Sequence, residues 1–138
     1  MNWQLLFKLS LFGLAMGIAT AFFIPSNIEG IFWLVIFIIS AYFIAKYCTR
    51  MYFTNGFCLS LLNCVWIIAA HLVFYDNYAK EHTKEVSMYN DNPYKISPQI
   101  ALTIIGIVIG VFSGLVQGLF AFIASKFILS NKGAPFQD

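Results

Sequence analysis

Residues 100–125 read IALTIIGIVIGVFSGLVQGLFAFIAS and contain no Asp, Glu, Lys or Arg. An α-helix rises about 1.5 Å per residue and the hydrocarbon core of a bilayer is about 30 Å thick, so about 20 apolar residues cross it. This stretch is therefore long enough to cross a bilayer as one helix. Three earlier stretches, residues 5–24, 31–47 and 57–75, are also long and predominantly apolar. The sequence therefore predicts four transmembrane helices.

The composition of the whole chain agrees with a membrane protein. Of the 138 residues, 60% are hydrophobic and 10% are charged, whereas a soluble domain carries about 25% charged residues. The net charge of +2 is small and scattered, while a nucleic-acid surface needs a contiguous basic stripe. We therefore expect a lipid bilayer as partner, no nucleic acid, and one all-α transmembrane domain over residues 1–138.

Short connections predict the topology of this domain. Pro25 ends the first helix because proline cannot continue it, and the turn at residues 49–56 is nearly as short. Helices joined by short loops pack as antiparallel neighbours. We expect helix one beside helix two, helix two beside helix three, and an up-down-up-down four-helix transmembrane bundle.

The outer connection, residues 76–98, contains acid–base pairs at helical spacing. We expect the third helix to extend beyond the membrane, with an aromatic stripe lying on the bilayer surface, and to end at Asn90-Asp91-Asn92-Pro93. Ser97-Pro98 then reads as an N-cap and a first-turn proline that open the fourth helix. The stripe consists of Tyr75, Tyr78, His82 and Tyr89.

Lys and Arg predict the orientation, because short cytoplasmic segments retain basic residues. One side of the arrangement would hold five basic residues and the other only three, all in the outer connection. We expect both termini in the cytoplasm. The two groups are Lys8, Lys46, Arg50, Lys126 and Lys132 inside, and Lys80, Lys84 and Lys95 outside.

Small residues recur at every fourth position on two of the predicted helices. Such faces allow two helices in lipid to approach closely. We expect helix one to dock on helix four; the alternative is that one face stays outward for self-association, or lines a pore. The helix-packing residues are Gly13, Gly17 and Ala21 on helix one, and Gly106, Gly110, Gly114 and Gly118 on helix four.

Three polar residues are predicted inside the membrane, where unpaired polar groups are costly. Asn63 and Gln117 lie at similar depth, so we expect their amides to bond to each other. His71 lies at the depth of Thr20 and is expected to be neutral and hydrogen-bonded between helices. The alternative is a proton-responsive or ligand-contacting His71. We expect His82 in the outer connection to lie on a solvated face rather than to bind a metal.

These features favour a non-catalytic function. No charged residue lies deep in a span, which argues against an ion-coupled transporter. No nucleophile and base at catalytic spacing is present, so we expect no enzyme, no catalytic residue, no cofactor and no metal site. We expect a scaffold, accessory subunit or sensor within a homo-oligomer or a larger membrane complex. The alternative is a small oligomeric channel or carrier assembled through the glycine-rich faces.

Four segments of the sequence define a layout that other small proteins also have. They are Thr54-Asn55-Gly56-Phe57, the segment from Tyr75 to Tyr89, Asn92-Pro93, and the helix from Gly106 to Lys126. In this layout the chain resembles small four-span bacterial integral membrane proteins of unknown function. The resemblance implies a multi-pass protein of the bacterial inner membrane. It implies no activity, and no site residue carries over from it.

Overall fold

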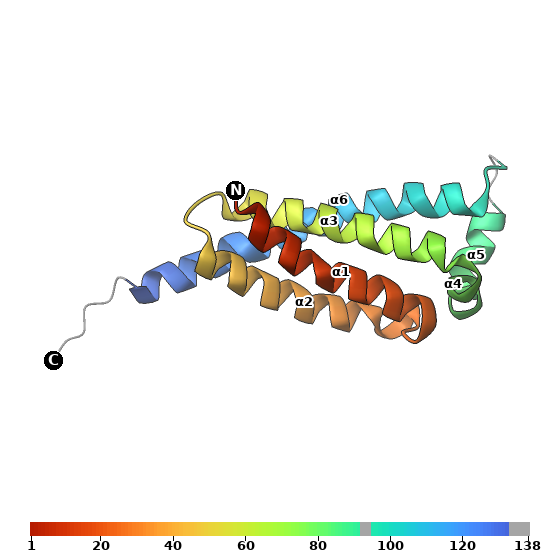
Figure 1. The fold of residues 1–138 in the computed structure, drawn as a ribbon, viewed down its shortest axis with the longest axis horizontal. Helices are drawn as coiled ribbons and strands as arrows, with labels where there is room; N and C mark the ends of the chain where they lie inside the picture. The colour runs from red at the N-terminus through yellow and green to blue at the C-terminus, as the bar shows by residue number, and fades with distance from the viewer. Residues whose placement is uncertain (92–94, 133–138) are drawn as a thin grey trace.

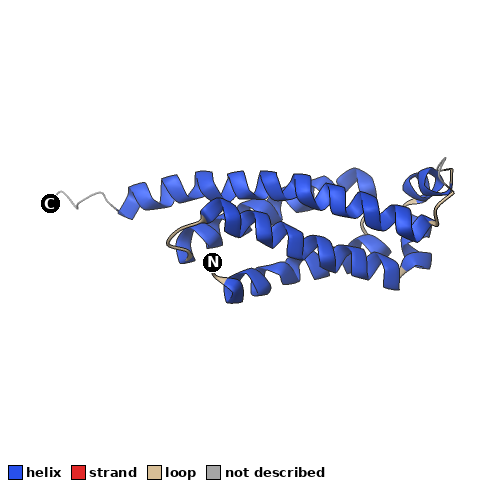
Figure 2. Cartoon of the chain, turned by 90° about the horizontal axis from the view of Figure 1, so that it is seen from above, coloured by secondary structure: helices blue, strands red, loops and turns tan. Residues whose placement is uncertain are grey.

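A computed structural model describes residues 1–91 and 95–132, with side chains to residue 128. All regular secondary structure in these ranges is helical (Figures 1 and 2). The helices are α1 (Trp3–Phe22), α2 (Ser26–Tyr47), α3 (Tyr52–Val73), α4 (Tyr75–Glu81), α5 (Thr83–Asn90) and α6 (Pro98–Lys132). Helix α5 ends at Asn90, the first residue of the expected stop, while Asn92 and Pro93 lie outside the described residues.

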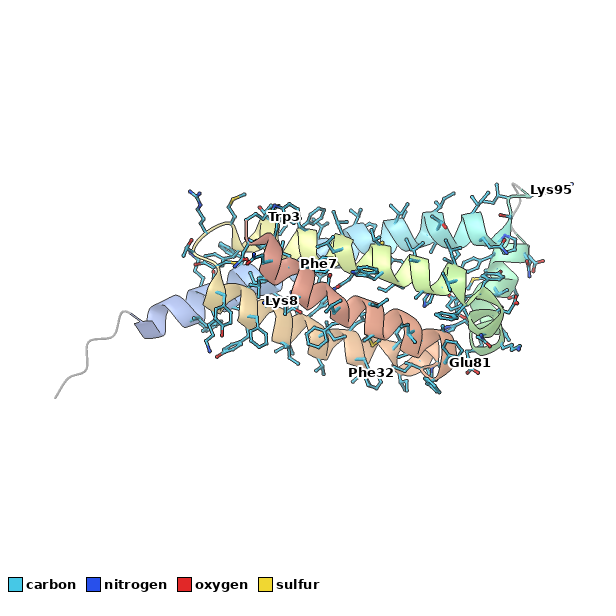
Figure 3. All side chains as sticks on the ribbon, in the orientation of Figure 1. Trp3, Phe7, Lys8, Phe32, Glu81 and Lys95 are labelled. Atoms are coloured by element: carbon cyan, nitrogen blue, oxygen red, sulfur yellow. The ribbon has the colours of Figure 1, made fainter. Side chains whose placement is uncertain are left out.

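Four of these helices are long and apolar enough to cross a membrane, as the sequence predicts. They are α1, α2, α3 and the Pro98–Ile128 part of α6. Large apolar side chains cover their outer surfaces: Ile109 is 60% exposed and Phe112 is 66% exposed. Figure 3 shows Phe7 and Phe32 projecting from the ribbon in the same way. Soluble monomers rarely expose so much apolar surface, so lipid is the solvent of this chain.

Local sequence signals explain several helix ends. The side chain of Asn2 accepts a hydrogen bond from the Leu5 backbone N–H and caps α1. The Ser97 hydroxyl lies 3.4 Å from the Ile100 backbone nitrogen and Pro98 is the first residue of α6, as expected. Between α2 and α3 the chain reverses at Met51, whose φ of 57° is left-handed.

Helix α3 lies at the centre of the packing. Its most extensive contacts are with α6 and α1, and α2 packs mainly on α6. The contacts of α2 with α1 and with α3 are slight, and no extensive contact joins α1 to α6. The expected docking of helix one on helix four is therefore wrong, because α1 packs on α3. Helices adjacent in the chain do contact each other, but α2 contacts α1 and α3 less extensively than it contacts α6. The cause lies in α3, which carries small or polar residues on two faces and accepts a close neighbour on each.

Two buried clusters hold the ends of the assembly. One joins α1, α2, α3 and α6 near the N-terminus, and the other joins α4 and α5 to α1 and α6. The first consists of Leu6, Leu9, Ala41, Ile44, Cys48, Leu59 and Ala121. The second consists of Ala21, Tyr78, Tyr89, Ala101 and Leu102.

The third long helix does not extend as one straight rod. It ends at Val73, and non-helical backbone angles at Phe74 and His82 separate it from α4 and α5. Helix α4 packs on α1 and α5 packs on α6. Tyr78, His82 and Tyr89 are buried, so the expected stripe faces the protein, not the bilayer surface. A straight extension would carry these side chains away from their partners on α1 and α6.

A cavity at the α4 and α5 end

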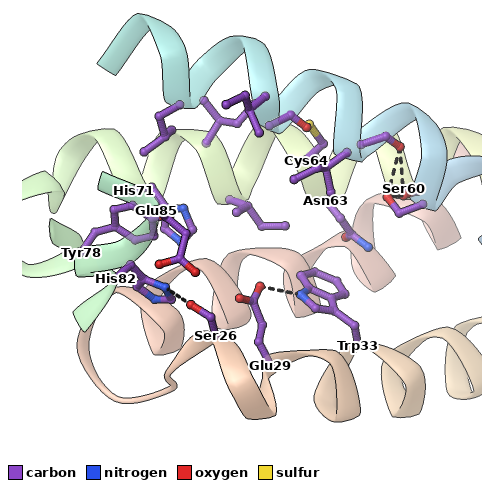
Figure 4. Close-up of a pocket in the computed structure, with 18 of the residues that line it drawn as sticks. Ser26, Glu29, Trp33, Ser60, Asn63, Cys64, His71, Tyr78, His82 and Glu85 are labelled. Carbon is purple, nitrogen blue, oxygen red and sulfur yellow. Dashed lines mark hydrogen bonds between the residues drawn. The ribbon is translucent and has the colours of Figure 1, made fainter. Parts of the chain in front are cut away.

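A cavity of about 470 Å³ lies between α2, α3 and α6 and reaches α4 and α5 (Figure 4). Ligand sites in proteins have volumes of about 300–1,000 Å³. The walls are apolar where Ile67 and Ile68 of α3 face Leu102 and Ile105 of α6. Polar side chains gather at its two ends. Those nearest α4 and α5 are Ser26, Glu29, His71, His82 and Glu85, and those deeper in the membrane span are Ser60, Asn63, Cys64 and Ser113.

The deep end is built by small residues on two helices. The Ser60 and Ser113 hydroxyls lie 2.9 Å apart, and the Cys64 thiol lies 3.2 Å from the Gly106 carbonyl oxygen. Because serine, cysteine and glycine have little or no side chain, α3 and α6 meet here through short polar contacts. The remaining space forms part of the cavity.

His71 is placed where the sequence predicts it, at the depth of Thr20. The Thr20 Oγ1 lies 2.8 Å from His71 Nε2, and both residues are buried. The His71 imidazole also stacks on the Tyr78 ring, with 4.2 Å between the ring centroids. The stacking contact joins α3 to α4. His71 therefore contacts α1 through Thr20 and α4 through Tyr78.

His82 is buried as well, which corrects the expectation of a solvated residue. Only 3% of it is exposed. Its Nε2 lies 2.9 Å from the Thr20 carbonyl oxygen and its Nδ1 lies 2.7 Å from the Ser26 hydroxyl. A carbonyl oxygen only accepts, so Nε2 carries a proton and donates it to the Thr20 carbonyl. The expectation of a solvated residue assumed a straight continuation of the third helix, whereas the backbone leaves helical angles at Phe74.

Two glutamates from different helices reach the same end of the cavity. Glu29 Oε1 accepts a hydrogen bond of 2.9 Å from the Trp33 indole N–H. The Ser26 hydroxyl beside Glu85 lowers the pKa of that carboxyl, although partial burial opposes the shift. Burial raises the pKa of Tyr78, and the neighbouring Tyr89 and both carboxylates add to the rise. The end of the cavity therefore carries two negative charges beside a neutral tyrosine.

Asn63 and Gln117 do not form the expected pair. The Gln117 Nε2 lies 3.4 Å from the Phe37 carbonyl oxygen on α2. Asn63 Oδ1 and Gln117 Oε1 are both buried and have no hydrogen-bond partner in the described part of the chain. The two residues lie on different faces of the assembly. Asn63 faces Gly13 of α1, while Gln117 lies between α6 and α2.

Every predicted small-residue position lies against other parts of the chain. A Cβ atom added at Gly13 or Gly17 would meet α3. Ala21 is fully buried in the cluster that joins α4 and α5 to α1 and α6. The sequence analysis missed Gly56 of α3, where an added Cβ would lie 2.6 Å from the Gln117 carbonyl oxygen. Cβ atoms added to the α6 glycines would meet Ile68 at Gly106, Cys64 at Gly110, Phe57 at Gly114 and Phe53 at Gly118.

The geometry favours binding over metal chemistry. Within the described residues no three His, Cys, Asp or Glu side chains are grouped so that they could hold a metal ion. The cavity instead offers an apolar middle and hydrogen-bonding groups at its ends, which suits an organic molecule. Comparisons with known protein families, with curated proteins and with solved structures gave no match.

Proposed function

We propose that this chain is a multi-pass membrane protein that binds a small amphipathic molecule and acts as a non-catalytic sensor or accessory subunit. The cavity between α2, α3 and α6 carries this proposal. Its isoleucine and leucine walls suit an apolar body, and the group of Ser26, Glu29, His82 and Glu85 suits a polar head. A partner membrane protein would respond to the bound state.

The proposed placement has the four long helices crossing a bacterial inner membrane alternately, as an up-down-up-down bundle. In Figure 1, α1 and α2 run in opposite directions, as do α3 and α6, which supports alternate crossings. Both termini would be cytoplasmic, because more of the basic residues fall near that side. The helices α4 and α5 and the polar end of the cavity would then face outward.

Helix α4 covers one end of the cavity, and such a cover suits a sensor. Helix α4 is held by stacking of Tyr78 on His71 and on His82, with centroid separations of 4.2 Å and 4.4 Å. A molecule that enters the cavity contacts these rings directly, because all three residues line it. Binding therefore changes the contacts of α4 with α1 and α3, and these changes reach the outer surface.

The alternative of a channel or carrier assembled through glycine faces receives no support from the packing. The glycines of α1 and α6 lie against α3 within the chain, so these faces are occupied. The outward surfaces of α2 and α6 consist of large apolar residues such as Ile31 and Phe112. Such surfaces suit lipid or a membrane partner and offer nothing to a hydrated ion.

Binding can be tested with the full chain in lipid nanodiscs and three probes that share an octyl tail: octylammonium, octanol and octyl sulfate. We expect at least one probe to raise the melting temperature, because a ligand stabilises the state that binds it by RT ln(1 + [L]/Kd). Ile67→Trp fills the half-buried cavity wall and should abolish the effect. Ile104→Trp, at a 51% exposed residue that does not line the cavity, is the matched control.

Two outcomes would contradict the proposal. One is that none of the three probes raises the melting temperature of the wild type. The other is that the shift is the same in Ile67→Trp and in Ile104→Trp, because the probes would then act through the lipid.

A further inference from the structure

We infer that the molecule bound in the cavity is a lipophilic organic cation, an amine with an apolar body, whose head group lies between Glu29 and Glu85. This inference rests on the proposed binding function and adds the chemical class of the ligand. The body would lie along the wall formed by Ile67 and Ile105.

The charges of the lining favour a cation. Glu29 and Glu85 line the cavity, and no Lys or Arg does. The two carboxylates come from α2 and α5, which are distant in sequence, so they converge only in the folded chain. Both are half-buried, and charges that leave water need a compensating charge or hydrogen bonds. The Trp33 indole N–H donates to Glu29, and Glu85 is stabilised chiefly by the Ser26 hydroxyl, with smaller contributions from the charges of His82 and Lys84.

The hydrogen-bonding groups favour a donor over an acceptor. The carboxylates of Glu29 and Glu85 only accept hydrogen bonds. A primary ammonium carries three donors and no acceptor. The Trp33 indole lines the same end, and an aromatic ring face attracts a cation further.

A free amine fits this lining better than a phospholipid head group. Phosphatidylethanolamine also carries an ammonium, but its phosphate would enter the cavity with no Lys or Arg to receive it. A divalent metal ion is a poorer fit, because no suitable group of three ligand side chains exists in the described residues. Because phosphatidylethanolamine also carries an ammonium group, it is the competing ligand that the experiment must distinguish from a free amine.

The test measures dissociation constants of octylammonium, octanol and octyl sulfate by calorimetry, on the full chain in phosphatidylcholine nanodiscs. We expect octylammonium to bind at least tenfold tighter than octanol, and octyl sulfate to bind weakest. The double variant Glu29→Gln with Glu85→Gln should weaken octylammonium at least tenfold and leave octanol unchanged. Glu81→Gln, at an exposed acid of α4 outside the lining, is the matched control and should change neither.

Octanol binding also reports whether the double variant is folded. If octylammonium and octanol bind equally well, or the double variant binds octylammonium like the wild type, the inference is wrong and the binding function stands. If no probe binds, the proposed function itself fails. Nanodiscs containing phosphatidylethanolamine test the source of the ammonium. We expect no competition from them, and a tenfold weaker octylammonium affinity would overturn the assignment to a free amine.

Discussion

The Thr20 hydroxyl on α1 lies 2.8 Å from Nε2 of His71 on α3, and both residues are buried. This hydrogen bond is one of the polar links between α1 and α3, together with the bond from the Trp66 indole N–H to the Ser10 hydroxyl. The two helices also meet through small residues such as Gly17 and Ala70. The backbone carbonyl of the same threonine accepts from His82. One residue of α1 therefore positions both histidines of the cavity.

Thr20→Val tests the contribution of this hydroxyl to stability. Valine has the same shape but leaves the buried His71 without its partner, and such a loss costs about 1–3 kcal/mol. We expect the free energy of unfolding to fall by about this amount in detergent titrations. Thr103→Val is the control, because the Thr103 hydroxyl bonds only to the Gln99 carbonyl within α6. Equal losses in the two variants would contradict the role of the helix-to-helix bond.

Gly56→Ala tests the close approach of α3 to α6. The new Cβ would lie 2.6 Å from the Gln117 carbonyl oxygen and 2.9 Å from Gly118 Cα. Backbone atoms cannot move aside cheaply, so we expect a loss of about 1–3 kcal/mol in unfolding free energy. Gly30→Ala on α2 meets nothing within 4 Å and should stabilise the helix by about 0.5–1 kcal/mol. Shifts of the same sign would contradict this packing.

Asn63→Leu tests whether the buried amide contributes to stability. Its Oδ1 has no partner in the described chain, so replacing it by an apolar group of similar size should leave the melting temperature unchanged or raise it. Asn55→Leu is the contrast. The fully buried Asn55 bonds to the Asn2 backbone nitrogen and to the Met51 carbonyl, and its loss should cost about 1–3 kcal/mol. A larger loss for Asn63→Leu than for Asn55→Leu would contradict the assignment.

Glu85 predicts a pH dependence of stability. Its pKa in the folded chain lies below the ordinary 4.5, chiefly because the Ser26 hydroxyl stabilises the charged form. A carboxyl with a lowered pKa stabilises the fold above its unfolded pKa and loses this contribution as pH falls through the folded value. We expect the difference in melting temperature between wild type and Glu85→Gln to be constant above about pH 5. The difference should shrink below pH 4.5.

His82 and Lys84 act on Glu85 through their charge and favour its ionised form, and Glu85 contributes to the raised pKa of Tyr78. These interactions are lost in Glu85→Gln, so the part of the difference assigned to the Glu85 carboxyl is its change below pH 4.5. A difference that grows as the pH falls below 4.5 would show that the Ser26 contact does not favour the charged carboxylate.

The sequence predicted the four membrane-length helices because their length and apolar character are local properties. It could not predict which helices pair. Small residues occur on α1 at Gly13, on α3 at Gly56 and on α6 at Gly110, and any two such faces are compatible. The choice of α3 as the shared partner depends on the fit of particular neighbours, such as Phe57 against Gly114, and this fit is a property of the whole assembly.

The sequence did not predict the cavity, and of the residues around it only the proximity of His71 and Thr20 was expected. His71 and Thr20 were matched by depth, which follows from the helical rise alone. Glu29, His82 and Glu85 were missed because they meet only after the chain bends at Phe74 and at His82. The one available signal was the spacing of Tyr78 and His82, which places both rings on one face of a helix. The sequence analysis places this face on the bilayer surface, because nothing in the sequence indicates a protein surface against which it could pack.

The central position of α3 also sets an order of events during synthesis. The chain emerges from its N-terminus, so α1, α2 and α3 enter the membrane before α6 exists. Until α6 arrives, the face of α3 with Ser60 and Cys64 has no partner, and α2 lacks the helix on which it mainly packs. A nascent chain stopped before residue 98 therefore exposes polar groups to lipid.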